Sequence, residues 1–364
     1  MIASTLPPTP AAPVNVNQAD FTYVGDPHTV FDLNGFYADV GVDANVTIKE
    51  TGAVKVPDEM TTAMPKADKK YKIGFSIFDT MDEVDTMILE SMRVAADEAD
   101  VELLVNDANY KQDAQNQAVK QWILEGVDGV ILAPCEFTAV KTALDALEAA
   151  NIPVVTLNAP LAGNINAAVI SNTVEQGTIS GELLEQVLLE SGKPMKGEIV
   201  YQTLPFMHPN AATRAKGFKD VFGKYLDVKI TELTGISPED HFNAFDRAIK
   251  ANPDILGAWG LYSSATIGMM NAQIANGSKI PLSSVDNDKP ILAGIDKGEV
   301  VGTAAYSAIA PARWIMSEMV NLLNGVPIPG IVFYENMEIT KENVAEAFRH
   351  YYPGKTLKDY EPGK

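Results

Sequence analysis

Polar side chains stand directly after the apolar, strand-like runs of this chain. In the first half they are carboxylates and amides, and the aromatic residue Phe78 precedes them; these polar residues are Asp79, Asp82, Asp85, Asn109, Glu136 and Asn158. In the second half an arginine and two tyrosines join them: Asn210, Arg214, Tyr262, Asp286 and Tyr306. Because a hydroxyl group both donates and accepts hydrogen bonds, carboxylates and guanidinium groups can each be matched to it. With rings to cover C–H faces, the set suits the binding of a polyhydroxylated molecule.

The arginine of this set lies in the stretch 197–222. An apolar run, Ile199 to Tyr201, leads through a proline-containing turn into a helix whose apolar spacing includes Phe218 and Phe222. We expect Arg214 in the first turn of this helix, beside the end of the strand. Ligands of open α/β sheets collect beyond the carboxyl ends of the strands. The planar fork of guanidinium donors would therefore face a ligand.

Helix capping is the alternative explanation for several of these residues. Asp or Asn before a helix is often an N-cap, and this applies to Asp82 and Asn109. Phe78 is equally compatible with a place in the core. Capping does not explain why polar residues of this kind follow the strands in both halves of the chain.

The sequence lacks the common catalytic and cofactor-binding motifs. The chain has no GxxxxGK[ST] phosphate loop and no GxGxxG opening a helix after a strand. Its four histidines form no HExxH pair, although His208 is a candidate for lining a cleft. No calcium loop of EF-hand spacing is present. We therefore predict a protein that is not an enzyme and that uses no cofactor and no metal; in the alternative of an enzyme, the carboxylates after Phe78 are the only candidates for acid–base chemistry.

The elements that must position the polar set alternate regularly. Apolar runs predict strands at 72–78, 102–107, 128–134, 152–158, 167–171, 198–202, 228–233, 255–260, 280–286 and 300–306, with helical patterns between them. This alternation indicates βαβ units and parallel sheets, and the continuous apolar character of the strands indicates sheets covered on both faces. Two similar halves joined near residue 171 predict two lobes with a ligand cleft between them.

Composition limits the function further. With 28 Lys+Arg against 48 Asp+Glu, the formal charge is −20, which disfavours nucleic acid as a partner. The single cysteine, Cys135, excludes an intrachain disulfide and is predicted to be a buried thiol. No apolar run reaches the roughly 20 residues that cross a bilayer. The first 20 residues have no signal-peptide pattern. The sequence is therefore compatible with a cytoplasmic protein, or with a processed form to which a new initiator methionine has been added.

Several motifs, in their order and spacing, resemble a known family. They are KIGFSIF, NDANYKQDAQNQ, GVDGVILAP, ANIPVVTLN, VISNTVEQGTISGELL, PDILGAWG and MEITKENV. Over roughly residues 71–345 they are similar to the periplasmic sugar-binding proteins of ABC transporters, within the ribose/galactose-binding branch. The resemblance implies two Rossmann-like lobes with parallel sheets, a hinge of three crossing strands, and a sugar trapped when the lobes close.

The resemblance also implies roles for particular residues. Its helix-start arginine falls on Arg214, with a second contact at Asn210, and further contacts fall on Tyr262, Asp286 and Tyr306. In the first half the sequence departs from the pattern. The usual Asp-Arg pair falls on Asn158 and Ala159, and the paired aromatic residues of the first loop fall near Val84 and Asp85. A polyol, a modified sugar or a cationic solute therefore stands beside an ordinary aldopyranose as the expected ligand.

We accordingly expect an N-terminal extension (1–70), a first lobe (71–171 and 307–336), a second lobe (172–306 and 337–345) and a C-terminal tail (346–364). The predicted function is a monomeric solute-binding protein of an ABC importer that works with a membrane permease, in the periplasm or outside the cell. A ligand-sensing domain for a chemoreceptor or sensor kinase is the alternative. Residues 1–20 are expected to be extended or disordered, and residues 21–64 to form a small irregular or β-rich appendage.

Overall fold

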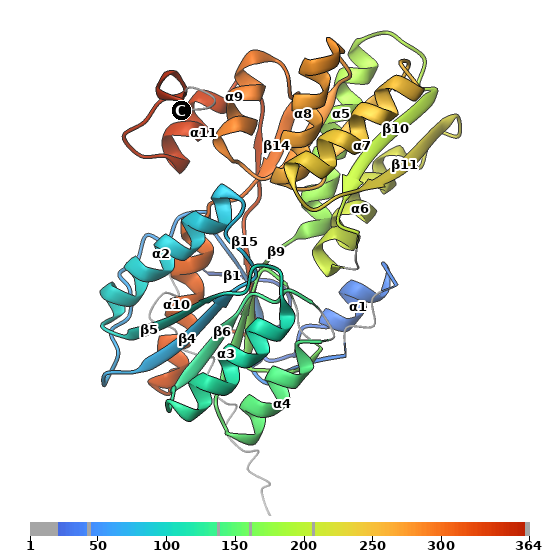
Figure 1. Cartoon of the computed structure of the whole chain (residues 1–364). Helices are drawn as coiled ribbons and strands as arrows, with labels where there is room; N and C mark the ends of the chain where they lie inside the picture. Colours follow the sequence, from blue (N-terminus) through green and yellow to red (C-terminus); the bar gives the residue numbers. More distant parts are fainter. Residues whose placement is uncertain (1–20, 42–44, 137–138, 160–161, 206–207, 361–364) are drawn as a thin grey trace, which may run out of the picture.

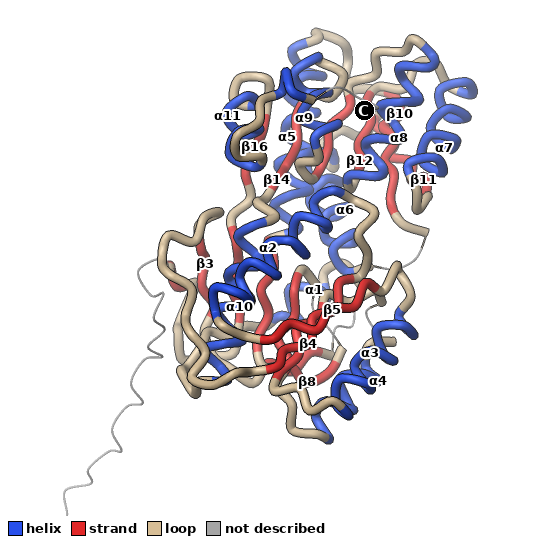
Figure 2. Tube along the Cα trace, turned by 60° about the vertical axis from the view of Figure 1, so that its left-hand side comes forward, coloured by secondary structure: helices blue, strands red, loops and turns tan. Residues whose placement is uncertain are grey.

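The protein is built from two α/β lobes, one above the other in Figure 1. The computed structural model describes residues 21–360, except for 42–44, 137–138, 160–161 and 206–207. The predicted extended lead, 1–20, lies outside the described residues. Within each lobe, helices lie on both sides of a central sheet (Figure 2).

The sheet of the first lobe has the strand order β1-β3-β15-β9-β7-β6-β4-β5. All neighbours are parallel except β1 and β3. The strands are β1 (Thr22–Tyr23), β3 (Ala53–Val56), β4 (Lys72–Ile77), β5 (Glu102–Asp107), β6 (Gly129–Leu132), β7 (Val154–Leu157), β9 (Ala167–Ser171) and β15 (Ile331–Tyr334). A two-stranded sheet, β2 (Val46–Ile48) with β8 (Gly163–Ile165), lies beside it.

Two cores cover the two faces of this sheet. On one face, α2 (Glu83–Ala99) and α10 (Ile309–Leu323) bury Ile88, Met92 and Trp314 against the strands. On the other, α3 (Gln112–Leu124) and α4 (Lys141–Ala149) bury Trp122 and Leu144. The continuous apolar strands predicted from the sequence are thus explained by a sheet that has no solvent-facing side.

The sheet of the second lobe has the order β11-β10-β12-β13-β14-β16, with only β16 antiparallel to its neighbour. The strands are β10 (Gly197–Thr203), β11 (Val228–Thr234), β12 (Gly257–Gly260), β13 (Leu282–Val285), β14 (Gly302–Ala305) and β16 (Met337–Ile339). The helices are α5 (Thr173–Glu190), α6 (Pro209–Phe222), α7 (Pro238–Ala251), α8 (Ser263–Asn276), α9 (Lys289–Lys297) and α11 (Val344–Tyr351), followed by the 3-10 turn η2 (Leu357–Asp359).

The chain passes between the lobes three times, as predicted. The crossings are 171–173 from β9 to α5, 305–309 from β14 to α10, and 334–337 from β15 to β16. Ser171 and Tyr306 lie buried in them. These three neighbouring segments form the predicted multi-strand hinge.

The two ends of the chain differ from their expected places. Residues 21–56 are not a separate appendage: β3 extends the sheet of the first lobe by pairing with β15, and α1 (Leu33–Ala38) buries Leu33 and Tyr37 in its core. Residues 344–360 are likewise not a free tail, because Phe348 and Tyr351 lie in the core of the second lobe. Both differences arise from contacts between residues that are remote in the sequence.

Helix α1 also brings the first lobe to α6 of the second lobe. Ala212 of α6 packs against the apolar cluster that contains Tyr37 of α1. Asp39 and Val40, just after α1, share a surface groove with Ala212 and other residues of α6. Figure 1 shows α1 below α6, on the side of the molecule away from α9 and α11.

Helices α5 and α6 approach so closely that their backbones touch. A Cβ atom on Gly177 would lie 1.9 Å from the carbonyl oxygen of Arg214, and one on Gly217 would lie 2.1 Å from that of Val174. Beside these glycines, the hydroxyl groups of Thr173 and Thr213 are 2.6 Å apart. The position of α6, and of Arg214 on it, therefore depends on the absence of two side chains.

We expect Gly217→Ala to lower the free energy of unfolding by about 1–3 kcal/mol, because the added methyl group must separate α5 from α6. The measurement is urea denaturation followed by far-UV circular dichroism. Gly223→Ala is the matched control: Gly223 has a helical φ of −59° and its nearest neighbouring atom would be 3.5 Å from the new Cβ. The control is expected to be neutral or stabilising by about 0.4–1 kcal/mol. Equal stability of the two variants would contradict the close packing.

Candidate functional site

A cavity lies between the lobes, beyond the carboxyl ends of both sheets. It contains about 740 Å³ of space between atoms, including solvent at its mouth. The first lobe contributes four of the residues predicted from the sequence, Phe78, Asp82, Asp85 and Asn158. The second lobe and the hinge contribute five, Asn210, Arg214, Tyr262, Asp286 and Tyr306. The structure thus brings together nine of the twelve predicted residues.

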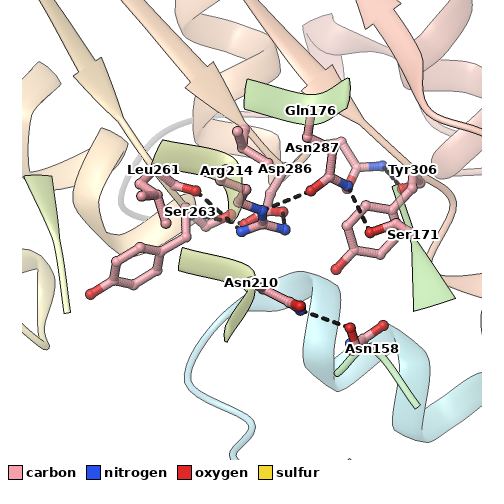
Figure 3. Close-up of polar contacts among 12 residues, drawn as sticks. Asn158, Ser171, Gln176, Asn210, Arg214, Leu261, Ser263, Asp286, Asn287 and Tyr306 are labelled. Atoms are coloured by element: carbon pink, nitrogen blue, oxygen red, sulfur yellow. Dashed lines mark hydrogen bonds and ion pairs between the residues drawn. The ribbon is translucent and has the colours of Figure 1, made fainter. Parts of the chain in front are cut away.

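Arg214 is held rigidly on the second-lobe side. Because α6 begins at Pro209, Arg214 lies in its second turn and not, as expected, in its first. Its Nε donates to Oε1 of Gln176 at 2.7 Å and Nη1 donates to the carbonyl oxygen of Leu261 at 3.1 Å (Figure 3). Its Nη2 lies 3.5 Å from Oδ1 of Asp286. Of the five guanidinium N–H groups, two have no partner among the described residues and remain for a ligand.

Asp286 is the acidic partner of this arginine. It follows β13 with a left-handed φ of 74°, a conformation that is uncommon for a residue with a side chain. Its Oδ2 accepts a hydrogen bond from the backbone of Ser263 at 3.0 Å. Burial raises the pKa of Asp286, and the charge of Arg214 opposes that rise. The carboxylate is therefore oriented by the start of α8 and by α6 together.

The corresponding place in the first lobe is occupied by Asn158. It follows β7, also with a left-handed φ, here 67°. Its Oδ1 accepts a hydrogen bond from the hydroxyl of Tyr334 at 2.7 Å. Its backbone carbonyl oxygen accepts one from Nδ2 of Asn210 at 2.8 Å, as Figure 3 shows. Oδ1 of Asn210 is buried and has no partner among the described residues. The two lobes thus touch inside the cavity and leave an acceptor unused there.

Further contacts between the lobes lie around the start of α2. Oγ of Ser264 donates to Oδ1 of Asp82 at 2.5 Å. The backbone N–H of Glu83 donates to Oδ2 of Asp288 at 3.0 Å, and the Glu83 carboxylate forms an ion pair with Lys289. Together with the bond between Asn210 and Asn158, these contacts define a closed arrangement of the two lobes.

The carboxylates of the first loop crowd one another. Burial, together with neighbouring carboxylates, raises the pKa of Asp79 and places the pKa values of Asp82 and Asp85 well above their usual range. Asp79 is fully buried but does not line the cavity: its Oδ1 accepts a hydrogen bond from the backbone of Met81 at 2.6 Å, and it also interacts with Tyr110. We infer that Asp79 shapes the loop that presents the other two.

Two predicted residues lie away from the cavity. Asn109 is exposed, with a left-handed φ of 47°, and its N–H donates to Oδ1 of Asp107 at 2.9 Å in a local turn. Glu136 is exposed, and its backbone N–H donates to Gln112. A position after a strand does not make a residue face the ligand when the backbone turns its side chain to solvent. A ligand-binding role for these two residues is not favoured by this geometry.

Other residues in the lining were not predicted. Tyr110 lies in it because the left-handed turn at 109–110 directs the ring inward, where it lies 5.9 Å from the ring of Phe78. Ser171 ends β9, so the rule of strand ends would have found it. Tyr334 ends β15, a strand for which the sequence had given no prediction.

Neither Cys135 nor His208 is poised as a nucleophile or a general base. Cys135 is buried, as predicted, and its pKa is raised to about 12 by burial and nearby carboxylates. His208 lines the cavity, but burial and the charge of Arg214 lower its pKa to about 4. Within the described ranges, no group of three His, Cys, Asp or Glu residues is arranged to hold a metal ion.

We expect the free energy of unfolding to depend on pH through Asp288, whose pKa is raised to about 7 by burial and by Asp286. Unfolded, this carboxyl ionises near pH 3.9. Between about pH 4 and 7 the folded state retains a proton that the unfolded state has lost, so this group's contribution to the free energy of unfolding falls as pH rises. Asp288→Asn should therefore gain melting temperature relative to the wild type, little at pH 4 and most at pH 7. Calorimetry of both proteins at these two pH values is the measurement.

The control for this experiment is Asp254→Asn, at an exposed position of the second lobe. The difference between its melting temperature and that of the wild type should be the same at both pH values. A difference between Asp288→Asn and the wild type that does not change with pH would show that Asp288 does not titrate as described.

Comparison with known proteins gives a consistent result. Residues 73–327 match the family model for a periplasmic binding protein domain. The xylitol-binding protein of Mycolicibacterium smegmatis is 23% identical over 283 residues, which cover 77% of this chain and 80% of that protein. The ribose import binding protein of Bacillus subtilis is 22% identical over 241 residues, which cover 65% and 76% respectively.

Solved structures share the fold. A solute-binding protein of an ABC transporter from Mycobacterium smegmatis, with bound glycerol, superposes with a TM-score of 0.72 at 22% identity and covers 76% of this chain and 96% of that one. Another, from Bacillus halodurans, with bound myo-inositol, has a TM-score of 0.71 at 19% identity and covers 78% and 98%.

Proposed function

The chain belongs to the family of periplasmic binding protein domains, and from this premise we propose that it captures a small polyhydroxylated solute, a sugar or a polyol, between its lobes. It delivers the closed complex to the membrane permease of an ABC importer. The proposal is supported by related proteins named for xylitol and ribose and by structures of the same fold that hold glycerol and myo-inositol.

One observation in this chain carries the proposal: hydrogen-bonding groups of both lobes converge on one cavity. Arg214 and Asp286 supply a fixed donor and acceptor on the second lobe, and the Asn210 side chain lies against Asn158 of the first. Phe78 and Tyr306 add aromatic surface to the lining. A ring or chain that carries hydroxyl groups can satisfy both lobes at once, whereas an apolar ligand would leave these buried groups unpaired.

The proposed mechanism is a shift of population from an open to a closed form. The bonds from Asn210 to Asn158 and from Ser264 to Asp82 join the lobes and exist only when they are closed. A ligand that touches both lobes adds contacts to the closed form alone, so it favours that form. Moving the equilibrium from mostly open to mostly closed takes about 5.5 kcal/mol of differential binding. Two or three charge-assisted hydrogen bonds, at about 1.5–3 kcal/mol each, are of this size.

The proposed place of action is the periplasm or the outer face of a cell, and the proposed partner is the permease. Among the described residues, no helix has the length and apolarity to cross a membrane. The protein is proposed to work as a monomer and as a carrier rather than as an enzyme, since the chemistry of its cavity serves binding.

We expect Arg214→Lys to weaken the binding of the solute by roughly 10- to 100-fold, because a lysine cannot reach Gln176, Leu261 and Asp286 together and present a second donor to a ligand. Titration calorimetry against a panel containing xylitol, ribose and myo-inositol gives the affinity. A solute at a hundredfold excess over its Kd should raise the stability of the wild type by about 2.7 kcal/mol.

Arg313→Lys is the matched control for this experiment. Arg313 forms an ion pair with Glu98 at 2.8 Å on the outside of the first lobe and does not line the cavity. Its replacement should leave the affinity unchanged. Equal affinities for Arg214→Lys and the wild type would refute the assignment of the site.

We expect Lys289→Met to weaken solute binding by about two- to fivefold. Lys289 pairs with Glu83 across the lobes and is partly exposed, and such pairs contribute about 0.2–1 kcal/mol. This pair contributes only to the closed form, so its loss appears in the affinity and in small-angle scattering of the unliganded protein, which should become more expanded. Lys297→Met, at an exposed position of the same helix, is the control. Unchanged scattering and affinity would show that the pair does not favour closure.

A further inference from the structure

The charges in the cavity lining do not balance. Three carboxyl groups line it, those of Asp82, Asp85 and Asp286, against one guanidinium, that of Arg214. His208 adds no charge near neutral pH because its pKa is lowered to about 4. The lining has Ala159 at the position where the resemblance to sugar-binding proteins implies a second arginine. The lining thus has more groups that can carry a negative charge than groups that carry a positive one.

Two of the three carboxyl groups have partners within the protein. Asp286 accepts the backbone N–H of Ser263 and lies 3.5 Å from Arg214. Asp82 accepts the hydroxyl of Ser264. Each of these two groups therefore has at least one partner before any ligand enters.

Asp85 is the third carboxyl group, and it has no such partner. It lies in the first turn of α2 and is only 5% exposed, yet no described residue donates a hydrogen bond to it or forms an ion pair with it. The charged groups that act on it are four other carboxyl groups, those of Asp79, Asp82, Asp286 and Asp288, which all disfavour its ionisation. A buried carboxylate without a donor is costly unless a ligand supplies one.

The surroundings of Asp85 suit a positively charged ligand group. The amino end of α2 favours a negative charge in its first turn, which offsets part of the cost of ionising Asp85 beside an ammonium group. The rings of Phe78, Tyr110, Tyr306 and Tyr334 line the same cavity, and aromatic faces attract a desolvated ammonium group. The groups suited to hydroxyls, Arg214 and Asn210, lie on the other lobe. The first lobe therefore offers the cavity a group for a cation, and the second lobe offers it groups for hydroxyls.

We propose that the solute is itself a cation: a polyhydroxylated compound bearing a protonated primary amine, such as an amino sugar or an amino polyol. Its ammonium group binds Asp85 and its hydroxyl groups bind Arg214, Asn210 and Asp286. This inference rests on the proposed function, since it names the class of solute for the same site. A neutral sugar would leave Asp85 without a charged donor, whereas an ammonium group supplies up to three N–H donors and a compensating charge.

The test compares matched ligands that differ only in the amine. D-glucosamine is paired with D-glucose, and 1-amino-1-deoxy-D-glucitol with D-glucitol, by titration calorimetry at pH 7. We expect the amine of at least one pair to bind about 10- to 100-fold more tightly than its neutral partner, the range of a charge-assisted hydrogen bond. Asp85→Asn should remove most of this preference by weakening the amine and not the neutral ligand.

Asp97→Asn is the control variant, because Asp97 lies on the same helix, exposed and outside the cavity. It should preserve the preference for the amine. The comparison of ligands on the wild-type protein also stands alone, so the test does not depend on the folding of Asp85→Asn.

The other outcomes are decisive against the inference. One such outcome is that the neutral ligand of each pair binds as tightly as its amine and that Asp85→Asn has no effect. This result would overturn the assignment of an amine to the solute and leave the proposed function intact. Asp85 would then be a protonated donor to a hydroxyl group. Tighter binding of choline than of any amino polyol would overturn the polyhydroxylated class. If no sugar, polyol or amine in the panel binds, both the proposed function and this inference fail.

Discussion

The contact between the backbones of α5 and α6 is the constraint on which the site depends. Gly177 and Gly217 let the two helices meet without side chains between them, and this contact fixes the register of Arg214 against Gln176. Arg214 in turn orients Asp286, whose own backbone is held in a left-handed conformation at the end of β13. A cation and a carboxylate buried together are stable only when their geometry is well defined. The tight crossing of two helices provides that definition, and the hydrogen-bonding groups of the cavity follow from it.

The two sides of the cavity differ in how far their charged groups are partnered within the protein. On the second lobe the two charged groups are tied to neighbours: Arg214 donates to Gln176, and Asp286 accepts from the backbone of Ser263. On the first lobe the carboxyl groups mainly repel one another, and after burial the largest effects on the ionisation of Asp85 come from four other carboxyl groups. We infer that the second lobe supplies a preformed half of the site and that the first lobe selects the ligand. Groups left unsatisfied in the free protein discriminate strongly, because a ligand that does not complete them binds at a cost.

Local sequence patterns predicted most of this architecture. The alternation of apolar strands and helices between 72 and 323 predicts the two-lobe fold. The rule that ligands bind beyond strand ends predicts that Arg214, Asp286 and Asp85 line one cavity. The failures have a common physical origin. The pairing of β3 with β15 joins residues nearly 280 positions apart, so no local pattern reveals it. Tyr334 is not predicted because it lies at the end of β15, a strand that no local pattern indicates. The sequence indicates Asn109 and not Tyr110 because the direction of a side chain depends on a turn that sequence position alone does not define.

The meeting of α1 with α6 has a thermodynamic consequence. Ala212 of α6 packs against the apolar cluster around Tyr37, so parting the lobes on this side would bring nonpolar surface into contact with water. Exposed nonpolar surface costs about 25 cal/mol for each Å². The open form is therefore penalised by hydration even without a ligand, and the resting equilibrium is displaced toward the closed form. A protein biased in this way needs less binding energy from its solute to close, and it releases that solute more slowly.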